Sequence, residues 1–342
     1  MREDLEPRFL EYLRAALECP RVDFAEPLAP LSGGFDTEIF AFRLSGAPPA
    51  LSGPLVLRVL GPHHDPLRAL RERATQNAVE DMGFPAPRAP LASADLRILG
   101  GAFLVMERRP GRPLLAARRL GIAALLAETH LRLHALDPAP LLDALDRAVP
   151  GSSAVVSLHG HLDQLEQRVI GRVSGLEPAM RWLREHRPSP GAALAICHGD
   201  FHPQNLLVEG RKVTAVLDWP NVLVADPACD VAATRVILDL APIGVLPVSR
   251  AARWGMAAAR RLLVALYLRG YRRRRPLVPR TLAYYEALAC MRGLVRAAEH
   301  RADAREAANP LDASSFGERL AGRFETLTGI RPELAPSSKL PG

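Results

Sequence analysis

The sequence predicts an α+β protein with a small β-rich N-terminal part and a larger, mostly helical C-terminal part. Strand-like apolar segments at residues 55–60 and 101–106 fall in the first third of the chain, and helical patterns dominate from Leu114 onward. Residues 195–232 interrupt these helices with a polar stretch that contains two short β-type runs. The expected order is therefore mainly strands first, then mainly helices, with a polar stretch and two short strands between the helices.

The chain is expected to open with a helix and a glycine-containing loop. Residues 3–18 repeat apolar side chains at helical spacing, which predicts an amphipathic helix. Strand-like segments then flank Ser32, Gly33 and Gly34. Glycines without a Cβ let backbone N–H groups approach a phosphate, so this loop is a candidate nucleotide-binding loop. An ordinary hairpin turn is the alternative.

Arg58 is the only polar residue in the first strong strand. A cation inside an apolar strand is costly unless it is paired, although an edge-strand arginine that faces water would also fit. Residues 66–82 form the next predicted helix, which carries Glu72. We hypothesise an ion pair between Arg58 and Glu72. Arg68 and Arg71 on the same helix are alternative partners of Glu72.

The C-terminal two thirds of the chain carry mostly helical patterns. In residues 123–136 the apolar side chains and two histidines indicate core packing, with no chemistry assigned to the histidines. Later helices are expected at residues 231–240, 249–271, 279–302 and 315–328. We therefore expect an N-terminal domain over residues 1–106, a helical domain over 107–330 and a flexible tail over 331–342.

Composition argues against a nucleic-acid partner. The formal net charge of +7 comes from 44 basic residues, of which only Lys212 and Lys339 are lysines. The arginines are spread along the chain, and the one run, residues 272–275, has little aromatic interleaving. A solvated helix end is the preferred interpretation of that run, and an anion-binding patch is the alternative.

The cysteines and the apolar segments point to a cytoplasmic protein. The four cysteines show no CxxC spacing, which argues against a zinc site and a disulfide framework. The N-terminus lacks an apolar signal segment, and arginines break the most hydrophobic late stretch, so no membrane partner is expected. The sequence gives no information on oligomeric state.

The polar stretch holds the candidate reactive residues. His198 to Asn205 form a loop, and two apolar β-type runs follow it, at residues 206–208 and 213–217. A hairpin of these runs would return Asp218 to the side of Asn205, with Asp200 on the same rim. Carboxylate and amide oxygens are hard ligands of the kind that Mg²⁺ prefers, which leaves Asp200 to orient or deprotonate a hydroxyl.

This stretch resembles a known family. The motifs HGDFHPQN, VLDWPN and DPACD, in this order, are similar to those of the aminoglycoside phosphotransferase and choline kinase-like family, small-molecule relatives of the protein kinases. The resemblance implies a bilobal protein kinase-like fold. It also implies that Asp200 is the catalytic base, that Asn205 and Asp218 are metal ligands, and that Asp226 and Asp230 support the loop.

The resemblance extends to the N-terminal part. It implies that Ser32, Gly33 and Gly34 cover the nucleotide phosphates and that the backbone at Glu107 contacts the adenine ring. The family has a lysine, held by a helix glutamate, at the position of Arg58. The resemblance therefore implies that Arg58 contacts the α and β phosphates of the nucleotide and that Glu72 holds Arg58 in place. The arginine is a departure from the family pattern.

The expected function is therefore transfer of the γ-phosphoryl group of ATP or GTP, with Mg²⁺, to a hydroxyl group of a small molecule. Residues 240–285 contain ten arginines and no acidic residue. If this region lines the acceptor pocket, a neutral or anionic acceptor fits better than a polycation. The sequence leaves two alternatives: a non-catalytic, pseudokinase-like nucleotide-binding protein, and a metal-dependent hydrolase built on His198, Asp200 and His202.

Overall fold

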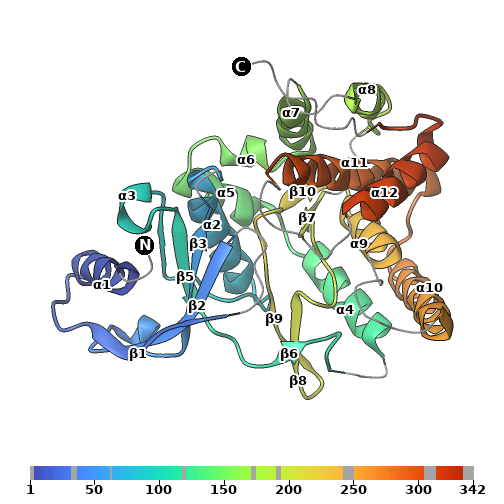
Figure 1. Ribbon diagram of the computed structural model, residues 1–342. Coiled ribbons are helices and arrows are strands. Elements are labelled where there is room, and N and C mark those ends of the chain that lie inside the picture. The colour runs from blue at the N-terminus through green and yellow to red at the C-terminus, as the bar shows by residue number, and fades with distance from the viewer. Residues whose placement is uncertain are drawn as a thin grey trace. The chain divides into compact units, whose positions relative to one another are not determined.

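The computed structural model in Figure 1 forms two compact units, each assembled from three segments of the chain. The first unit comprises Met1–Arg118, Ala139–Ser153 and Gln204–Asn221, and the second comprises Arg119–Pro138, Ala154–Pro203 and Val222–Gly342. The structure describes residues 4–31, 37–61, 64–117, 121–170, 175–189, 194–241, 250–303 and 313–333.

The first unit contains a five-stranded antiparallel sheet. Its strand order is β1-β2-β3-β5-β4, and Arg58 on the central strand pairs with Ile39 on one side and Leu104 on the other. The strand predicted at residues 55–60 is confirmed, and the one predicted at 101–106 runs from Phe103 to Glu107. The strands are β1 (Asp23–Pro30), β2 (Thr37–Ser45), β3 (Leu55–Leu60), β4 (Leu91–Ser93) and β5 (Phe103–Glu107).

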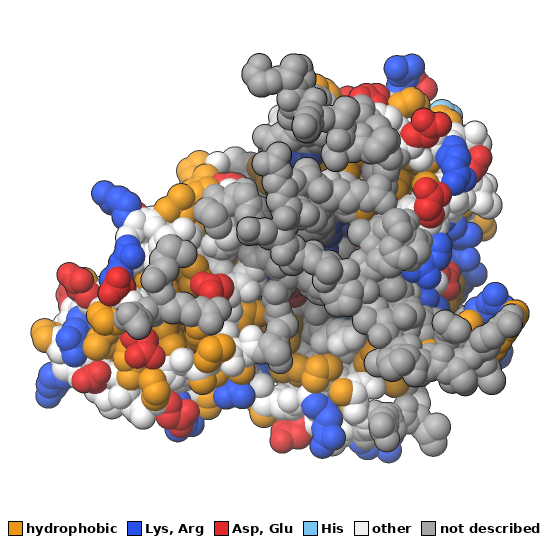
Figure 2. All heavy atoms as spheres, in the orientation of Figure 1, with side chains coloured by type: hydrophobic (Ala, Val, Ile, Leu, Met, Phe, Trp, Pro, Cys, Tyr) orange, Lys and Arg blue, Asp and Glu red, His pale blue; other side chains and the backbone are white. Residues whose placement is uncertain are grey.

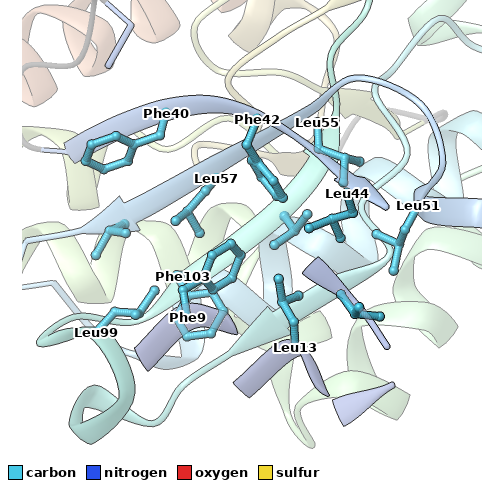
Figure 3. Close-up of a cluster of buried hydrophobic side chains, with 13 residues drawn as sticks. Phe9, Leu13, Phe40, Phe42, Leu44, Leu51, Leu55, Leu57, Leu99 and Phe103 are labelled. Carbon is cyan, nitrogen blue, oxygen red and sulfur yellow. The ribbon is translucent and has the colours of Figure 1, made fainter. Parts of the chain in front are cut away.

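Helix α1 (Leu5–Ala16) covers the apolar face of this sheet. Its buried Phe9 and Leu13 pack into a core with side chains from β2, β3 and β5 (Figure 3). The Phe9 ring meets the ring of Phe42 edge to face, with centroids 5.5 Å apart. The alternation of side chains along β3 therefore sends Leu57 and Val59 into the core and leaves Arg58 on the opposite face.

The first unit also contains further helices and a small second sheet. Helix α2 (Leu67–Asp81) carries Glu72 and packs against α5 (Ala139–Ala148). The small sheet has the order β6-β8-β9. The remaining elements are η1 (Pro49–Leu51), α3 (Leu96–Leu99), β6 (Arg112–Pro113), β8 (Leu206–Glu209) and β9 (Lys212–Val216).

The second unit is mostly helical. The long helix α11 packs against α9 and α12, and the short strands β7 and β10 pair antiparallel. All four late helices predicted from the sequence are present, with bounds within three residues of those expected. The elements are α4 (Ile122–His134), α6 (Ser152–Val155), α7 (Leu158–Val169), α8 (Glu177–Glu185), β7 (Ala195–Cys197), β10 (Leu223–Ala225), α9 (Ala228–Leu240), α10 (Arg250–Arg272), α11 (Pro279–Asp303) and α12 (Ala313–Thr328).

One face of the molecule is mixed in charge (Figure 2). On the face drawn in Figure 2, basic and acidic side chains lie interspersed, with apolar side chains among them. Within the described ranges, no helix has the length and apolar composition needed to cross a lipid bilayer.

Candidate active site

The strand cation of the first unit is held by two carboxylates. Arg58 Nη1 lies 2.7 Å from Glu72 Oε1, and Arg58 Nη2 lies 3.0 Å from Asp218 Oδ1. The hypothesised ion pair with Glu72 is confirmed. Glu72 is 1% exposed, so this pair is buried, whereas the Asp218 side chain is 37% exposed. Arg58 thus joins strand β3, helix α2 and the segment after β9.

The environment of Arg58 keeps it charged. Burial alone would lower the pKa of its guanidinium, but the charges of Glu72 and Asp218 and the hydrogen bond to Asp218 raise it instead. Gln76 Nε2 also donates a hydrogen bond of 3.3 Å to Glu72 Oε1. The other oxygen of Glu72 is buried and has no hydrogen-bond partner in the described structure, so the carboxylate depends on Arg58 for its stabilisation.

The hairpin predicted beside the reactive loop is confirmed. Strands β8 and β9 pair with Leu206 opposite Val216, and the N–H of Leu217 donates a hydrogen bond of 2.8 Å to the carbonyl oxygen of Asn205. The two strand ends therefore meet, which brings the backbone of Asn205 next to that of Asp218. This return follows from antiparallel pairing across a tight turn at Gly210, where φ is +55°.

Asp218 has an unusual backbone conformation. Its φ of 67° lies in the left-handed region, which aspartate tolerates better than most residues that have a Cβ. The next residue anchors the bend, because Trp219 is fully buried, donates a hydrogen bond of 2.8 Å to Val216 O and packs edge to face on Phe84. Residues held in sparsely populated backbone regions cluster at functional sites.

Asn205 and Asp218 are suited to a divalent cation. Both belong to the first unit, and both offer oxygen atoms, the donors that Mg²⁺ prefers over nitrogen and sulfur. Asp218 lies at a left-handed turn, and its carboxylate forms an ion pair with the guanidinium of Arg58. The donor chemistry fits, and the assignment of these two residues as metal ligands stays a prediction.

Asp200 lies in the second unit, in the loop that follows β7. The loop backbone is held from α9, because Asp230 Oδ2 accepts a hydrogen bond of 2.6 Å from the N–H of His198 and Asp230 Oδ1 accepts one of 2.9 Å from Gly199. The supporting role expected of Asp230 is therefore confirmed. The Asp200 carboxylate lies 3.5 Å from His202 Nε2 and is 19% exposed.

Asp200 is ionised at neutral pH. Burial alone would raise its pKa, but the hydrogen bond from His202 and the charges of His202, His198 and Arg296 outweigh burial and lower the pKa to about 2. Such a carboxylate is a weak base but a good hydrogen-bond acceptor for a hydroxyl group. It can therefore orient an alcohol for attack without having to be deprotonated first.

A buried polar network beneath this loop was missed by sequence reasoning. His130 Nδ1 lies 2.6 Å from the Tyr267 hydroxyl, and His134 Nδ1 lies 2.7 Å from the Tyr271 hydroxyl. The Nε2 atoms of the two histidines lie 2.9 and 3.3 Å from Asp230 Oδ2. The only sequence signal is the matched spacing of four residues in both pairs, which places each pair on one helix face.

This network is structural. Two histidines and a carboxylate are a possible metal-binding set, and their ligand atoms lie within 4.8 Å of one another. However, both Asp230 oxygens already accept backbone hydrogen bonds from the His198 and Gly199 N–H groups. Burial, followed by the charge of His130, lowers the pKa of His134 to about 4, so His134 is neutral at neutral pH. We therefore assign these side chains to positioning the loop.

The sequence predicts nucleotide contacts at the glycine-containing loop and at the end of strand β5. Ser32, Gly33 and Gly34 lie outside the described residues. Glu107 ends strand β5, where its N–H donates a hydrogen bond of 2.8 Å to Arg88 O and its carboxylate lies 3.1 Å from Arg109. The adenine contact assigned to the backbone at Glu107 stays a prediction.

The chain matches a known enzyme family over most of its length. Residues 27–277 match the model of the phosphotransferase enzyme family, a span that contains Arg58, Glu72, Asp200, Asn205 and Asp218. The chain belongs to this family. A rat protein named acyl-CoA dehydrogenase family member 11 is 30% identical to this chain over 173 residues. That match covers 47% of this chain and 22% of the rat protein, so the chain spans a minor part of its length.

Solved structures of phosphotransferases share the fold of this family member. A candidate aminoglycoside phosphotransferase from Ralstonia eutropha matches with a TM-score of 0.61 and 19% identity, covering 96% of this chain and 99% of that one. Macrolide 2'-phosphotransferase MphH from Brachybacterium faecium matches with a TM-score of 0.52 and 16% identity, covering 97% and 99%. The protein kinase-like α+β fold expected from the sequence is confirmed.

Proposed function

We propose that this phosphotransferase family member moves the γ-phosphoryl group of a nucleoside triphosphate to a hydroxyl group of a small molecule, with Mg²⁺. The observation that carries the proposal is the bridge from Arg58 to Glu72 and Asp218. Enzymes of phosphoryl transfer neutralise phosphate charge with positioned cations. Arg58 is such a cation, because a buried glutamate on a helix holds it next to a second carboxylate.

Each residue has a distinct proposed task. A divalent cation held by Asn205 and Asp218 would neutralise charge on the transferring group. Arg58 would bind phosphate oxygens with its fixed cation, and Glu72 would keep the guanidinium in place. Asp200 would accept a hydrogen bond from the acceptor hydroxyl and take its proton late in the reaction, as suits a carboxylate whose pKa is about 2.

The donor is proposed to be ATP or GTP. Structures of aminoglycoside phosphotransferase APH(4)-Ia with the same fold contain ADP or AMP-PNP together with hygromycin B, which supports an adenine nucleotide. We propose that Ser32, Gly33 and Gly34 cover the phosphates and that the backbone at Glu107 contacts the base. The Arg58 guanidinium can grip phosphate with two nitrogens where the family lysine supplies one.

Labelled nucleotide tests this proposal. The protein is incubated with ATP or GTP labelled in the γ-phosphate and a pooled metabolite extract, with Mg²⁺ or with EDTA. We expect labelled, acid-stable phosphoesters in the Mg²⁺ sample, at rates lowered at least about a hundredfold by EDTA or by Asp218→Asn. Asparagine tolerates the left-handed backbone at this position, so this variant changes the charge with little effect on the fold.

A non-catalytic nucleotide-binding protein is the second candidate, because arginine replaces the family lysine at residue 58. The same samples separate the two candidates when thermal melting is recorded beside transfer. Stabilisation by Mg²⁺ and ATP without any labelled product would favour the non-catalytic protein. Labelled product that persists in the Asp218→Asn variant would contradict the metal-site assignment.

A further inference from the structure

Two arginines on α11 have no charged partner among the described residues. Arg292 is half-buried and Arg296 is exposed, one helical turn apart. Among the described residues, neither side chain has a hydrogen bond or a carboxylate within ion-pair distance. Like charges four residues apart on a helix repel each other, so the fold gains nothing from this pair.

Other half-buried arginines of these helices are paired. Arg168 on α7 lies 2.5 Å from Glu299 on α11, Arg184 on α8 lies 2.6 Å from Asp163, and Arg235 on α9 lies 2.5 Å from Glu286. A guanidinium that is partly removed from water without a counter-charge costs free energy. The contrast therefore indicates that the guanidinium of Arg292 is available to a ligand, with the exposed guanidinium of Arg296 one helical turn away.

Helix α7 lies next to the part of α11 that carries Arg292. Residues 161 and 168 on α7, and 292 and 299 on α11, are each seven apart, or about two helical turns. The ion pair between Arg168 and Glu299 fixes one level of the helix contact. His161 lies close enough to Arg292 for the two side chains to interact electrostatically. Burial, followed by the charges of Arg292 and Arg168, lowers the pKa of His161 well below its usual range.

His161 adds an unsatisfied polar atom to the cluster. Its Nε2 is buried and has no hydrogen-bond partner in the described part of the chain. Because this histidine is neutral, it can supply one N–H donor without adding charge. A buried polar atom without a partner is rare in folded proteins and is an indication of an absent ligand or water.

The arginines also lie near the candidate catalytic carboxylate. Helix α11 packs along α9, whose Asp230 holds the backbone of the loop that carries Asp200. The charge of Arg296 helps to lower the pKa of Asp200, and the charge of Asp200 acts in turn on Arg292. A molecule that presents a hydroxyl group to Asp200 therefore has two free guanidinium groups close by.

We propose that Arg292 and Arg296, with His161, form an anion-binding subsite for the acceptor, so that the hydroxyl group to be phosphorylated belongs to a molecule with a carboxylate or phosphate group. This inference rests on the proposed function and specifies its acceptor class. Guanidinium groups bind both anions with paired N–H donors, and they repel the amines of a polycation. The subsite lies wholly within the second unit.

Three related small molecules test the subsite. Glycerol, glycerate and glycerol 3-phosphate share a hydroxyl-bearing carbon chain and differ in the terminal group, and ethanolamine serves as the cationic comparison. Binding to the full chain is measured by ligand-observed NMR at constant ionic strength, with Mg²⁺ and AMP-PNP present to occupy the nucleotide phosphate contacts. Transfer from ATP is measured in parallel.

We expect both anions to bind at least about tenfold more tightly than glycerol and ethanolamine. The Arg292→Gln/Arg296→Gln double variant should lose about 30-fold or more in affinity for the anions, and little for glycerol. Arg280→Gln, which removes one exposed charge from the same helix, should leave the preference unchanged. The Arg292→Lys/Arg296→Lys double variant keeps both charges and should retain part of the preference for anions. Its comparison with the glutamine double variant separates the effect of charge from an effect on folding.

The outcomes distinguish this inference from the proposed function. Equal binding of glycerol and the two anions, or an anion preference that survives in the glutamine double variant, would overturn the anion subsite even if transfer to neutral alcohols is observed. Anion binding that depends on both arginines, without transfer to any hydroxyl compound, would support the subsite and contradict the phosphotransferase. A preference for only one anion would identify the acceptor group as carboxylate or phosphate.

Discussion

At the scale of single residues, the geometry of Arg58 explains why an arginine works on this strand. Its planar fork places one nitrogen on Glu72 and another on Asp218, whereas a lysine has a single nitrogen to offer. The ion pair of Arg58 with Glu72 is buried. Replacing Arg58 by a neutral residue would therefore leave the Glu72 carboxylate without a counter-charge. Stability and chemistry are therefore coupled at this residue.

Arg58→Gln should destabilise the protein by about 3 to 5 kcal/mol, because Glu72 would be left as an uncompensated buried charge. Arg58→Lys should cost less, since an ammonium group can still reach one carboxylate. Urea unfolding measures both variants. Arg43→Gln on neighbouring β2 is the control, because its pair with Glu26 at 3.7 Å is exposed and should contribute at most about 1 kcal/mol. A loss for Arg58→Gln no larger than that of the control would contradict the buried-pair account.

At the scale of elements, close backbone contacts fix the strand that carries Arg58. Gly101 precedes β5, and a Cβ added there would lie 2.1 Å from the carbonyl oxygen of Leu60. Leu60 in turn donates a hydrogen bond of 2.8 Å to Ala102 O. Glycine at residue 101 therefore permits the end of β3 to lie against the chain that enters β5.

Gly101→Ala should destabilise the first unit by at least about 1 to 3 kcal/mol, because the backbone must shift to relieve the contact. Gly53→Ala is the matched control, since a Cβ at that position meets no atom within 4 Å. We expect the control to stay within about 0.5 kcal/mol of the natural protein in urea unfolding. Equal effects of the two substitutions would show that the β3–β5 contact is looser than described.

The helices of the second unit are joined by the histidine and tyrosine pairs, which give a pH dependence to stability. The pKa of His134 is about 4 in the folded protein, against a usual value of 6.5, so its neutral form is favoured by the fold. The stability contributed in this way is fully present above about pH 6.5 and is lost as the pH falls towards 4. The expected loss is up to about 3 kcal/mol.

Unfolding free energies between pH 7 and pH 4 test this expectation. His134→Gln should flatten the pH dependence, while His186→Gln, which changes an exposed histidine, should preserve it. An unchanged slope in the His134→Gln variant would show that another group accounts for the acid sensitivity.

At the scale of the whole molecule, local patterns were sufficient for several features of the first unit, but they did not predict the contact of Arg58 with Asp218. The strand around Arg58, the helix with Glu72 and the hairpin from Asn205 to Asp218 each have a short-range signal in the sequence. The packing of α5 on α2 and the pairing of His130 with Tyr267 connect residues that are far apart in the chain. No single-sequence pattern specifies such partners, because they depend on tertiary packing.

The same limit applies to the functional residues. Asp200, Asn205 and Asp218 were found from residue type and spacing, and their catalytic and metal-binding roles stay predictions. Arg292, Arg296 and His161 gave no signal, because arginines are common throughout this chain. Three-dimensional structure was needed to show that half-buried Arg292 has no hydrogen-bond or ion-pair partner among the described residues, whereas Arg168, Arg184 and Arg235 are paired.

The rate of a single turnover in the Asp200→Asn variant tests the central claim most directly. Asparagine preserves the shape of the side chain and removes the negative charge that orients the acceptor hydroxyl. With saturating Mg²⁺ and ATP, we predict that phosphoryl transfer slows by about 10²- to 10⁴-fold while the nucleotide remains bound. A variant that transfers phosphate as fast as the natural protein would contradict the assignment of Asp200 and the mechanism built on it.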